Sequence, residues 1–259
     1  MKFHIPNALV VSHKKIGDKI YSLIFNAPEI ANSASPGQFV HIRCSNGLDP
    51  LLRRPISIND VDKEKGLVSI WYQVVGKGTE FLSKVKVGEC LDVIGALGRG
   101  FDSNIDGKNV LLIGGGMGIA PLIYLGSVIS KKNTVRGIFG GRNKDVIPCI
   151  LSESNFDYEL CTEDGSIGRE GLVTDLLEDQ LHKEKIDAIY SCGPKPMLTA
   201  MQRISSREEI PLQVSLEAVM ACGVGACLGC AFKGYRDGEE AWLKVCKDGP
   251  VFWDSEVKW

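Results

Sequence analysis

Four cysteines near the C-terminal end of the chain have the residue type and spacing of an iron–sulfur site. They lie in the segments MACGVGACLGC and KVCKDGPVF, spaced C-x4-C-x2-C with fifteen residues before the last cysteine. The first part of this spacing is that of plant-type [2Fe–2S] proteins, whose cluster needs four thiolates. The pattern predicts one [2Fe–2S] cluster with these ligands: Cys222, Cys227, Cys230 and Cys246.

The residues between these cysteines agree with that prediction. Gly223, Gly225 and Gly229 let a loop turn tightly and direct backbone N–H groups at sulfur. The alternative is a zinc site with the same four ligands, although zinc ribbons bring two C-x2-C knuckles and only Cys227 and Cys230 have that spacing. A disulfide framework is disfavoured further, because we expect a reducing compartment.

An apolar stretch at residues 51–58 carries side chains that can bind an anion. Pro55 holds Arg54 extended and removes one backbone donor, which predicts an edge or rim position with Ser57 close by. An arginine fork can bind a pyrophosphate through two hydrogen bonds. A surface strand with solvated arginines explains the same residues equally well.

A glycine-rich turn, GKGTE at residues 76–80, follows a predicted strand that contains Trp71, Tyr72 and Gln73. It predicts a helix over 80–84 with Thr79 as its N-cap. Such a turn into a helix N-terminus can bind an anion, and a simple capped helix is the alternative.

The segment LLIGGGMGIAP at residues 111–121 lies between a predicted strand and a predicted helix, the context of a dinucleotide fingerprint. It departs from G-x-G-x-x-G because Ile119 takes the place of the third glycine, so a structural turn remains an alternative. The acidic ribose ligand is missing at residues 140–143, which carry GGRN, so NAD and NADP are not distinguished. A later strand ends in the tight turn SCGP at 191–194, where a ligand could lie across the sheet edge.

These segments need three kinds of structural unit to position them. Short apolar runs separated by turns predict a small all-β barrel over residues 1–102, with strands at 21–25, 38–43, 67–74 and 91–94. Strands at 110–113, 135–139, 158–161 and 186–192 alternate with helices at 120–129, 172–182 and 196–205, which predicts a parallel α/β domain over 103–212. The remaining unit, 213–259, is too small for its own core, and a metal is the usual substitute.

Composition excludes several classes of function. The chain has 259 residues with 30 basic and 32 acidic side chains, a net charge of −2, which removes the broad basic field of a nucleic-acid binder. The sequence contains no run of about 18 apolar residues, the length that spans a membrane. Its start lacks the cationic segment followed by an apolar segment that marks a signal peptide. We therefore expect a cytoplasmic protein, in which these scattered cysteines are inert core residues: Cys44, Cys90, Cys149, Cys161 and Cys192.

Taken in order, RPIS, GKGT, GGGMGIAP, CGP and C-x4-C-x2-C-x15-C resemble the ferredoxin-NADP reductase superfamily over essentially the whole chain. More closely, the chain resembles the electron-transfer subunits of the two-subunit, NAD-dependent bacterial dihydroorotate dehydrogenases. Plant-type ferredoxins separate their last two ligands by a longer stretch, so the fifteen-residue gap favours this family. The resemblance implies FAD in the barrel, a nicotinamide nucleotide in the α/β domain and one [2Fe–2S] cluster in the tail.

The resemblance also implies which residues contact each group. The tail cysteines would ligate the cluster. Within the flavin set, Ser57 is our candidate for a hydrogen bond at the reactive edge of the flavin. Relatives tend to have a different residue at the position of Trp71, but a contact of the strand backbone with the flavin does not depend on the side chain. The residues implied for FAD are Arg54, Pro55, Ile56, Ser57, Trp71, Tyr72, Gln73, Gly78 and Thr79. Those implied for NAD are Gly114, Gly115, Gly116, Met117, Gly118, Pro121, Cys192, Gly193 and Pro194.

The function implied by the resemblance is electron transfer within a complex. Electrons from an FMN-containing catalytic subunit would pass through the [2Fe–2S] cluster and FAD to NAD+, in pyrimidine (UMP) biosynthesis. A heterotetramer with two copies of each subunit is expected. The chain should not oxidise dihydroorotate alone, because its 259 residues leave no room for the roughly 250-residue (β/α)8 barrel that would hold FMN. The alternatives are a subunit of a sulfide dehydrogenase or an NADPH:ferredoxin oxidoreductase, and a zinc-stabilised nucleotide-binding regulator.

Overall fold

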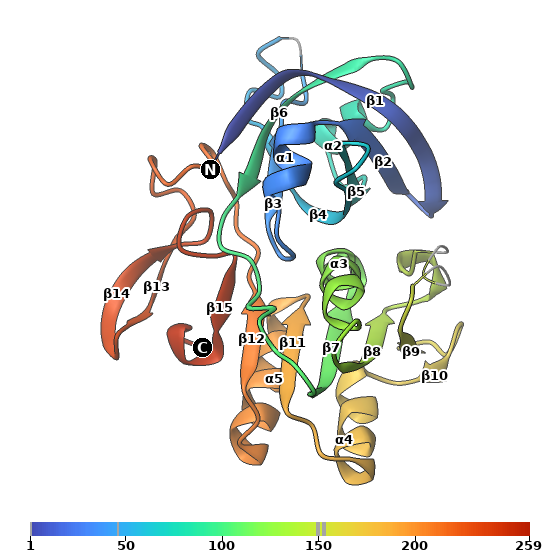
Figure 1. The fold of residues 1–259 in the computed structure, drawn as a ribbon, viewed down its shortest axis with the longest axis vertical. Helices are drawn as coiled ribbons and strands as arrows, with labels where there is room; N and C mark the ends of the chain where they lie inside the picture. Colours follow the sequence, from blue (N-terminus) through green and yellow to red (C-terminus); the bar gives the residue numbers. More distant parts are fainter. Residues whose placement is uncertain (1, 46, 149–150, 152–153) are drawn as a thin grey trace.

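The computed structural model describes residues 2–45, 47–148, 151 and 154–259. Figure 1 shows a barrel stacked on an α/β sheet, with the C-terminal segment beside both. This is the predicted combination of an antiparallel barrel, a parallel-sheet domain and a small C-terminal region. In the part of the chain that the structure describes, no helix is both long and apolar enough to cross a membrane.

The N-terminal unit is a closed six-stranded barrel with the order β1-β2-β5-β4-β3-β6. Its strands are β1 (Phe3–Gly17), β2 (Ile20–Asn26), β3 (Phe39–Ile42), β4 (Arg54–Asp62), β5 (Leu67–Gln73) and β6 (Cys90–Leu97). Two short helices, α1 (Pro28–Ser33) and α2 (Lys77–Leu82), are inserted between strands. The predicted strands are confirmed, since alternate residues such as Leu23, Phe25 and Ile70 fill the interior.

Strand β1 was not predicted. Most of its side chains are exposed or half-buried, so its sequence lacks the alternation that marks the other strands. It forms because its backbone pairs with β6 through its first half and with β2 through its second half. Pairing to two neighbours therefore stabilises a strand that its own apolar pattern does not indicate.

The α/β domain is built on a seven-stranded sheet of order β10-β9-β8-β7-β11-β12-β15. All neighbours are parallel except β12 and β15. The strands are β7 (Asn109–Gly115), β8 (Thr134–Gly141), β9 (Asp157–Thr162), β10 (Arg169–Glu170), β11 (Ala188–Cys192), β12 (Leu212–Ser215) and β15 (Val251–Trp253). The helices are α3 (Ile119–Ile129), α4 (Val173–Lys183) and α5 (Lys195–Glu208), as predicted to within a few residues. Figure 1 places α3 between the sheet and the barrel, with α4 and α5 on the far side.

The C-terminal segment folds onto the α/β domain. Its hairpin, β13 (Ala231–Arg236) and β14 (Glu239–Lys244), is followed by β15, which adds an antiparallel strand to the large sheet. Leu243, Val245 and Phe252 are buried in the same cluster as sheet residues such as Leu111. The segment thus shares its core with the sheet, and the expected boundary between residues 212 and 213 falls inside β12.

Hydrogen bonds fix the barrel against the α/β domain. The amide of buried Asn59 donates to the Ala120 carbonyl at 3.2 Å, and the Tyr124 hydroxyl donates to the Ala34 carbonyl at 3.2 Å. Because both bonds join α3 to the barrel and are buried, the two units hold a fixed orientation. The surfaces of the barrel and the α/β domain that face one another beside α3 can therefore form a binding site of fixed shape.

The scattered cysteines are mostly core residues, as predicted. Cys44, Cys161 and Cys192 are buried free thiols. Cys90 is exposed, so the prediction was wrong for it: it is the first residue of β6, at the end of the strand, where the barrel core does not cover it. Cys149 lies outside the described residues.

Candidate functional site

Two strands of the barrel separate and leave a slot. Strand β4 pairs with β5 only from Ile58 onward, while residues 54–57 pair with β3 alone. On the other side, residues 71–73 of β5 pair with β2 and not with β4. The predicted edge position of Pro55 is thus a local opening inside a closed barrel. Proline is tolerated there because no neighbour on the open side needs its missing N–H.

This slot opens into a cavity of about 340 Å³ between the barrel, α3 and the segment after β12. Predicted flavin residues line it: Arg54, Pro55, Ile56, Ser57, Trp71, Tyr72, Gln73 and Thr79. Other residues that were not predicted also line it, among them Phe39, Ser215, Glu217 and Met220. The cavity can accept a flat ring system, because strand backbone and apolar side chains form its walls and polar groups are few.

Arg54 lies at one end of this cavity, against the glycine-rich turn. A side chain on Gly78 would meet the Arg54 Nε at 2.6 Å, so the glycine makes room for the guanidinium. The Arg54 Nη1 donates to the Leu52 carbonyl at 2.6 Å, which holds the side chain across the turn. Its remaining donors can bind an anion with two hydrogen bonds. Arg53, by contrast, is bound to Asp92 at 2.8 Å and has a structural role.

The role predicted for Thr79 as an N-cap was wrong. Helix α2 begins at Lys77 and Gly76 is its N-cap, so Thr79 is the third helical residue. Its hydroxyl accepts hydrogen bonds from the backbone N–H groups of Val75 at 2.9 Å and Gly76 at 3.3 Å. The threonine therefore stabilises the turn from within the first turn of the helix. The helix begins three residues earlier than the sequence pattern predicted.

A second cavity, of about 870 Å³, lies at the carboxyl ends of the parallel strands. Of the residues predicted for the nicotinamide nucleotide, these line it: Gly115, Gly116, Met117, Gly118, Gly193 and Pro194. Gly114 and Pro121 do not line it, and Cys192 lines the first cavity instead. Arg142, Asn143 and Glu163 follow β8 and β9 and also face this space. Ligands of open parallel sheets bind at this edge.

Gly118 allows two turns of the site to touch. A Cβ atom at this position would lie 2.2 Å from the Cys192 carbonyl oxygen and 2.8 Å from the Gly193 nitrogen. Only a glycine permits this approach of backbone to backbone. Gly118 thus joins the turn after β7 to the turn after β11, and both turns line the second cavity.

We expect Gly118→Ala to lower the free energy of unfolding by roughly 1–3 kcal/mol, the usual cost of overpacking. Chemical denaturation would measure this change, and nucleotide binding should weaken with it. The matched control is Gly76→Ala, where a Cβ meets nothing within 4 Å and φ is 176°, which any residue adopts. Equal unfolding curves for Gly118→Ala and the wild type would contradict the contact.

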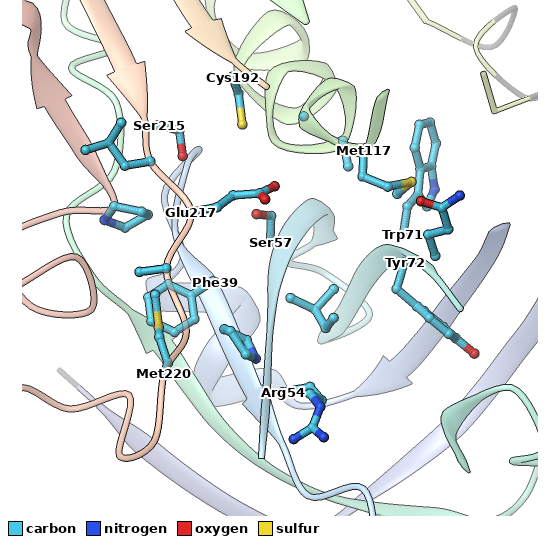
Figure 2. Close-up of a pocket in the computed structure, with 18 of the residues that line it drawn as sticks. Phe39, Arg54, Ser57, Trp71, Tyr72, Met117, Cys192, Ser215, Glu217 and Met220 are labelled. Atoms are coloured by element: carbon cyan, nitrogen blue, oxygen red, sulfur yellow. The ribbon is translucent and has the colours of Figure 1, made fainter. Parts of the chain in front are cut away.

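The two cavities adjoin one another. Gln73, Met117, Gly118 and Glu217 line both, so ligands bound in them would touch at this boundary. Figure 2 shows the Ser57 hydroxyl and the Glu217 carboxyl directed into the same space, with Cys192 beyond them. Glu217 is accessible from the cavities, yet the surrounding protein desolvates its carboxyl and raises the pKa. Glu217 lies two residues after the end of β12, and because β12 was not predicted as a strand of this sheet, the sequence offered no signal for it.

Cys192 is unreactive in this setting. Burial raises the pKa of its thiol to about 12, and the nearby charge of Glu217 acts in the same direction. The thiol therefore stays protonated at neutral pH, which suits a packing role against a bound ring and not a nucleophilic one.

The four C-terminal cysteines come together in two pairs. Cys222 is beside Cys227, and Cys230 is beside Cys246. Two neighbouring pairs fit a two-iron cluster, because each iron takes two of the four thiolates.

Backbone N–H groups are directed at the cysteine sulfurs. Ala226 donates to the Cys222 Sγ at 3.3 Å, Gly229 to the Cys227 Sγ at 3.5 Å, and Cys246 to the Cys230 Sγ at 3.4 Å. Desolvation opposes ionisation of Cys222, but the backbone N–H of Val224 and the other nearby donors outweigh it and lower the pKa to about 6. The loop therefore stabilises negative charge on sulfur, and its residues fit a [2Fe–2S] cluster.

Among known proteins, the chain is similar in sequence to electron transfer subunits. The model of the iron-sulfur cluster binding domain of dihydroorotate dehydrogenase B matches residues 217–258. The dihydroorotate dehydrogenase B (NAD(+)) electron transfer subunit of Caldanaerobacter subterraneus subsp. tengcongensis is 41% identical over 250 residues, covering 96% of this chain and 97% of the relative. That of Desulforamulus reducens is 40% identical over 256 residues, covering 98% of both.

Solved structures share the architecture. That of an NADH-dependent reduced ferredoxin-NADP oxidoreductase, studied for flavin-based electron bifurcation, has a TM-score of 0.85 at 32% identity and covers 98% of this chain and 90% of that one. A ferredoxin NADP+ reductase from Neisseria gonorrhoeae with bound FAD and NADP has a TM-score of 0.63 at 18% identity, covering 80% and 91%. At that identity the second likeness concerns the fold alone.

Proposed function

Because the chain belongs to the family of electron transfer subunits of NAD-dependent dihydroorotate dehydrogenase B, we propose that it delivers electrons taken from dihydroorotate by a separate FMN-containing subunit to NAD+, in pyrimidine biosynthesis. The observation that carries the proposal is the shared boundary of the two cavities, at Gln73, Met117, Gly118 and Glu217. A flavin and a nicotinamide held in them would be in contact.

We assign the cofactors to the three units. FAD would occupy the slot of the barrel, with its pyrophosphate on Arg54 beside Gly78 and Thr79, and the nicotinamide nucleotide would occupy the second cavity. The paired cysteines Cys222, Cys227, Cys230 and Cys246 would hold a [2Fe–2S] cluster. When bound, a flavin accepts electrons singly and gives them up as hydride, and an iron–sulfur cluster carries one electron at a time.

The residues of this chain would bind and orient these groups. Ser57 would hydrogen bond at the reactive edge of the flavin, and Met117 and Cys192 would pack around it and exclude water. Hydride transfer demands no side-chain acid or base, so none is assigned. NAD is preferred over NADP because the relatives of this chain are subunits of NAD-dependent enzymes.

The cluster segment would face the partner subunit. Cys227 is exposed, and so are the apolar side chains of Val219 and Leu228 nearby. An electron crosses between proteins most readily where the cluster is close to the surface, and exposed apolar residues favour a protein contact. We propose a heterotetramer with two copies of each subunit, working in the cytoplasm, where thiols stay reduced. The chain alone would not oxidise dihydroorotate.

Related complexes remain the second candidate. The similarity to a bifurcating oxidoreductase favours them, but the curated relatives near 40% identity are dihydroorotate dehydrogenase subunits. Co-purification with the catalytic subunit and an assay of dihydroorotate-dependent NAD+ reduction decides the matter. Activity with dihydroorotate supports the proposal, whereas a complex that reduces NAD+ only with sulfide or reduced ferredoxin would replace it.

We expect Ser57→Ala to slow the reduction of the flavin by NADH roughly 5- to 100-fold, the range for losing one hydrogen bond at the reacting group. FAD content should stay near one per chain, because the substitution leaves the pyrophosphate end unchanged. Anaerobic stopped-flow spectroscopy would measure the rate. Ser33→Ala, at an exposed serine whose hydroxyl donates within α1, is the control. An unchanged rate would remove Ser57 from the flavin edge.

A further inference from the structure

The barrel strand next to the flavin slot carries a histidine that also touches the cluster loop, residues 220–230. His41 lies in β3, is fully buried, and pairs with Pro55 of β4. Pro55 lines the first cavity. The ring of His41 is therefore one strand away from the slot in which we place the flavin.

On its other side, the His41 ring lies against Gly223. A Cβ atom on Gly223 would be 2.4 Å from the His41 Nδ1 and 3.0 Å from its Cε1. Gly223 is itself buried and has a φ of +67°. It directly follows the cluster ligand Cys222, whose loop enters from Met220 at the wall of the first cavity. One side chain thus contacts both the strand pair and the loop.

Among the residues that the structure describes, neither ring nitrogen of buried His41 has a partner with hydrogen-bond geometry, although backbone groups of Arg53 and Cys222 lie close to the ring. A buried polar group without a partner destabilises the folded state. A packing residue of leucine or phenylalanine type would avoid that cost. A histidine at this position is better explained if its nitrogens serve the loop when the cluster is in place.

We propose that His41 is a positioning residue for the iron–sulfur cluster, whose ring seats the cluster loop at Gly223 and fixes Cys222 relative to the flavin strand. This inference rests on the proposed function, because it needs a cluster on the four cysteines. The ring acts through the loop and is not itself a ligand. Its role is to keep one geometry between the two redox groups, on which the rate of electron transfer between them depends.

A double-mutant cycle tests the contact in the purified complex. Gly223→Ala should change the EPR spectrum of the reduced cluster and slow electron transfer between flavin and cluster after mixing with NADH. His41→Ala should relieve the clash, so that the double variant lies closer to the wild type than Gly223→Ala does. Such non-additivity is the signature of residues in contact.

Gly225→Ala is the matched control within the same loop. Gly225 also has a positive φ, +88°, but its added Cβ would meet the Lys247 side chain and not His41. His41→Ala should therefore not rescue it. Strictly additive effects at Gly223, or equal rescue of both glycine variants, would overturn the proposal.

A second pair of variants tests whether the ring nitrogens of His41 are needed. His41→Asn keeps a nitrogen donor near the Nδ1 position, and His41→Leu fills the space without one. We expect the asparagine variant to keep the cluster's midpoint potential and the leucine variant to change the ratio of reduced to oxidised cluster about tenfold at a fixed potential, which is 59 mV for one electron. Equal potentials in all three proteins would contradict this role.

These outcomes separate the inference from the proposed function. If the wild-type protein contained no iron and gave no EPR signal, both would fall together. If the wild type carried a normal cluster and every His41 and Gly223 variant matched it in spectrum, potential and rate, only the role of His41 would be lost.

Discussion

Cys246→Ala will abolish electron transfer from the partner subunit to NAD+ while the flavin still reacts with NADH. Cys246 is buried beside Cys230, and burial raises the pKa of its thiol to about 12. Its sulfur can be a thiolate there only if a cation compensates the charge. Without this ligand one iron keeps a single protein sulfur, and the cluster should not assemble.

The measurement compares iron content with two activities of the same preparation. Iron should fall to background, and so should dihydroorotate-dependent NAD+ reduction by the complex. Oxidation of NADH by an artificial acceptor that takes electrons from the flavin should remain near the wild-type rate. Cys90→Ala, at the exposed cysteine of the barrel, should keep both activities. Full partner-dependent activity in Cys246→Ala would show that the four cysteines do not form the electron path.

Arg54→Met should weaken FAD binding by roughly 10- to 150-fold, because a hydrogen bond to a charged group contributes about 1.5–3 kcal/mol. The methionine keeps a flexible unbranched side chain but has no donor that could bind the pyrophosphate. Titration of the apoprotein with FAD, followed by flavin fluorescence, gives the dissociation constant. The protein should still fold, since Arg54 is only partly buried and makes no ion pair with another side chain in the described residues.

Two further variants frame the Arg54 result. Gly78→Ala should weaken FAD binding in the same direction, because its Cβ would displace the guanidinium from 2.6 Å away. Arg207→Met, which removes an exposed arginine of α5 that pairs with Glu178 of α4, should leave FAD binding unchanged. If all three variants bound FAD equally, the pyrophosphate would lie elsewhere.

The sequence predicted the parts of the site that depend on local spacing. The cysteine ligands lie in one loop and one later turn. The glycines beside them are needed because the loop turns tightly, so both features are visible in the local sequence. The same holds for the turn after β7, because a strand, a tight turn and a helix are all recorded within residues 110–129. In each case the pattern and the geometry arise from neighbours in the chain.

What the sequence could not predict depends on contacts between distant segments. Glu217 reaches the boundary of the cavities because β12 joins the sheet beside β11, and no local pattern marked β12. Nothing in the local sequence distinguishes His41 from other strand residues. Its contact with Gly223 is visible only in the folded structure. The opening between β4 and β5 likewise depends on where their pairing stops, at Ile58.

The most direct test of the electron-transfer account is an anaerobic visible spectrum of the purified protein with its partner, before and after NADH, with iron and flavin quantified. We predict flavin bands with a broad iron–sulfur shoulder, about two irons per FAD, and bleaching of both by NADH. A colourless protein that contains zinc would contradict the account, and so would a flavin that NADH reduces while an intact cluster in the same chain stays oxidised.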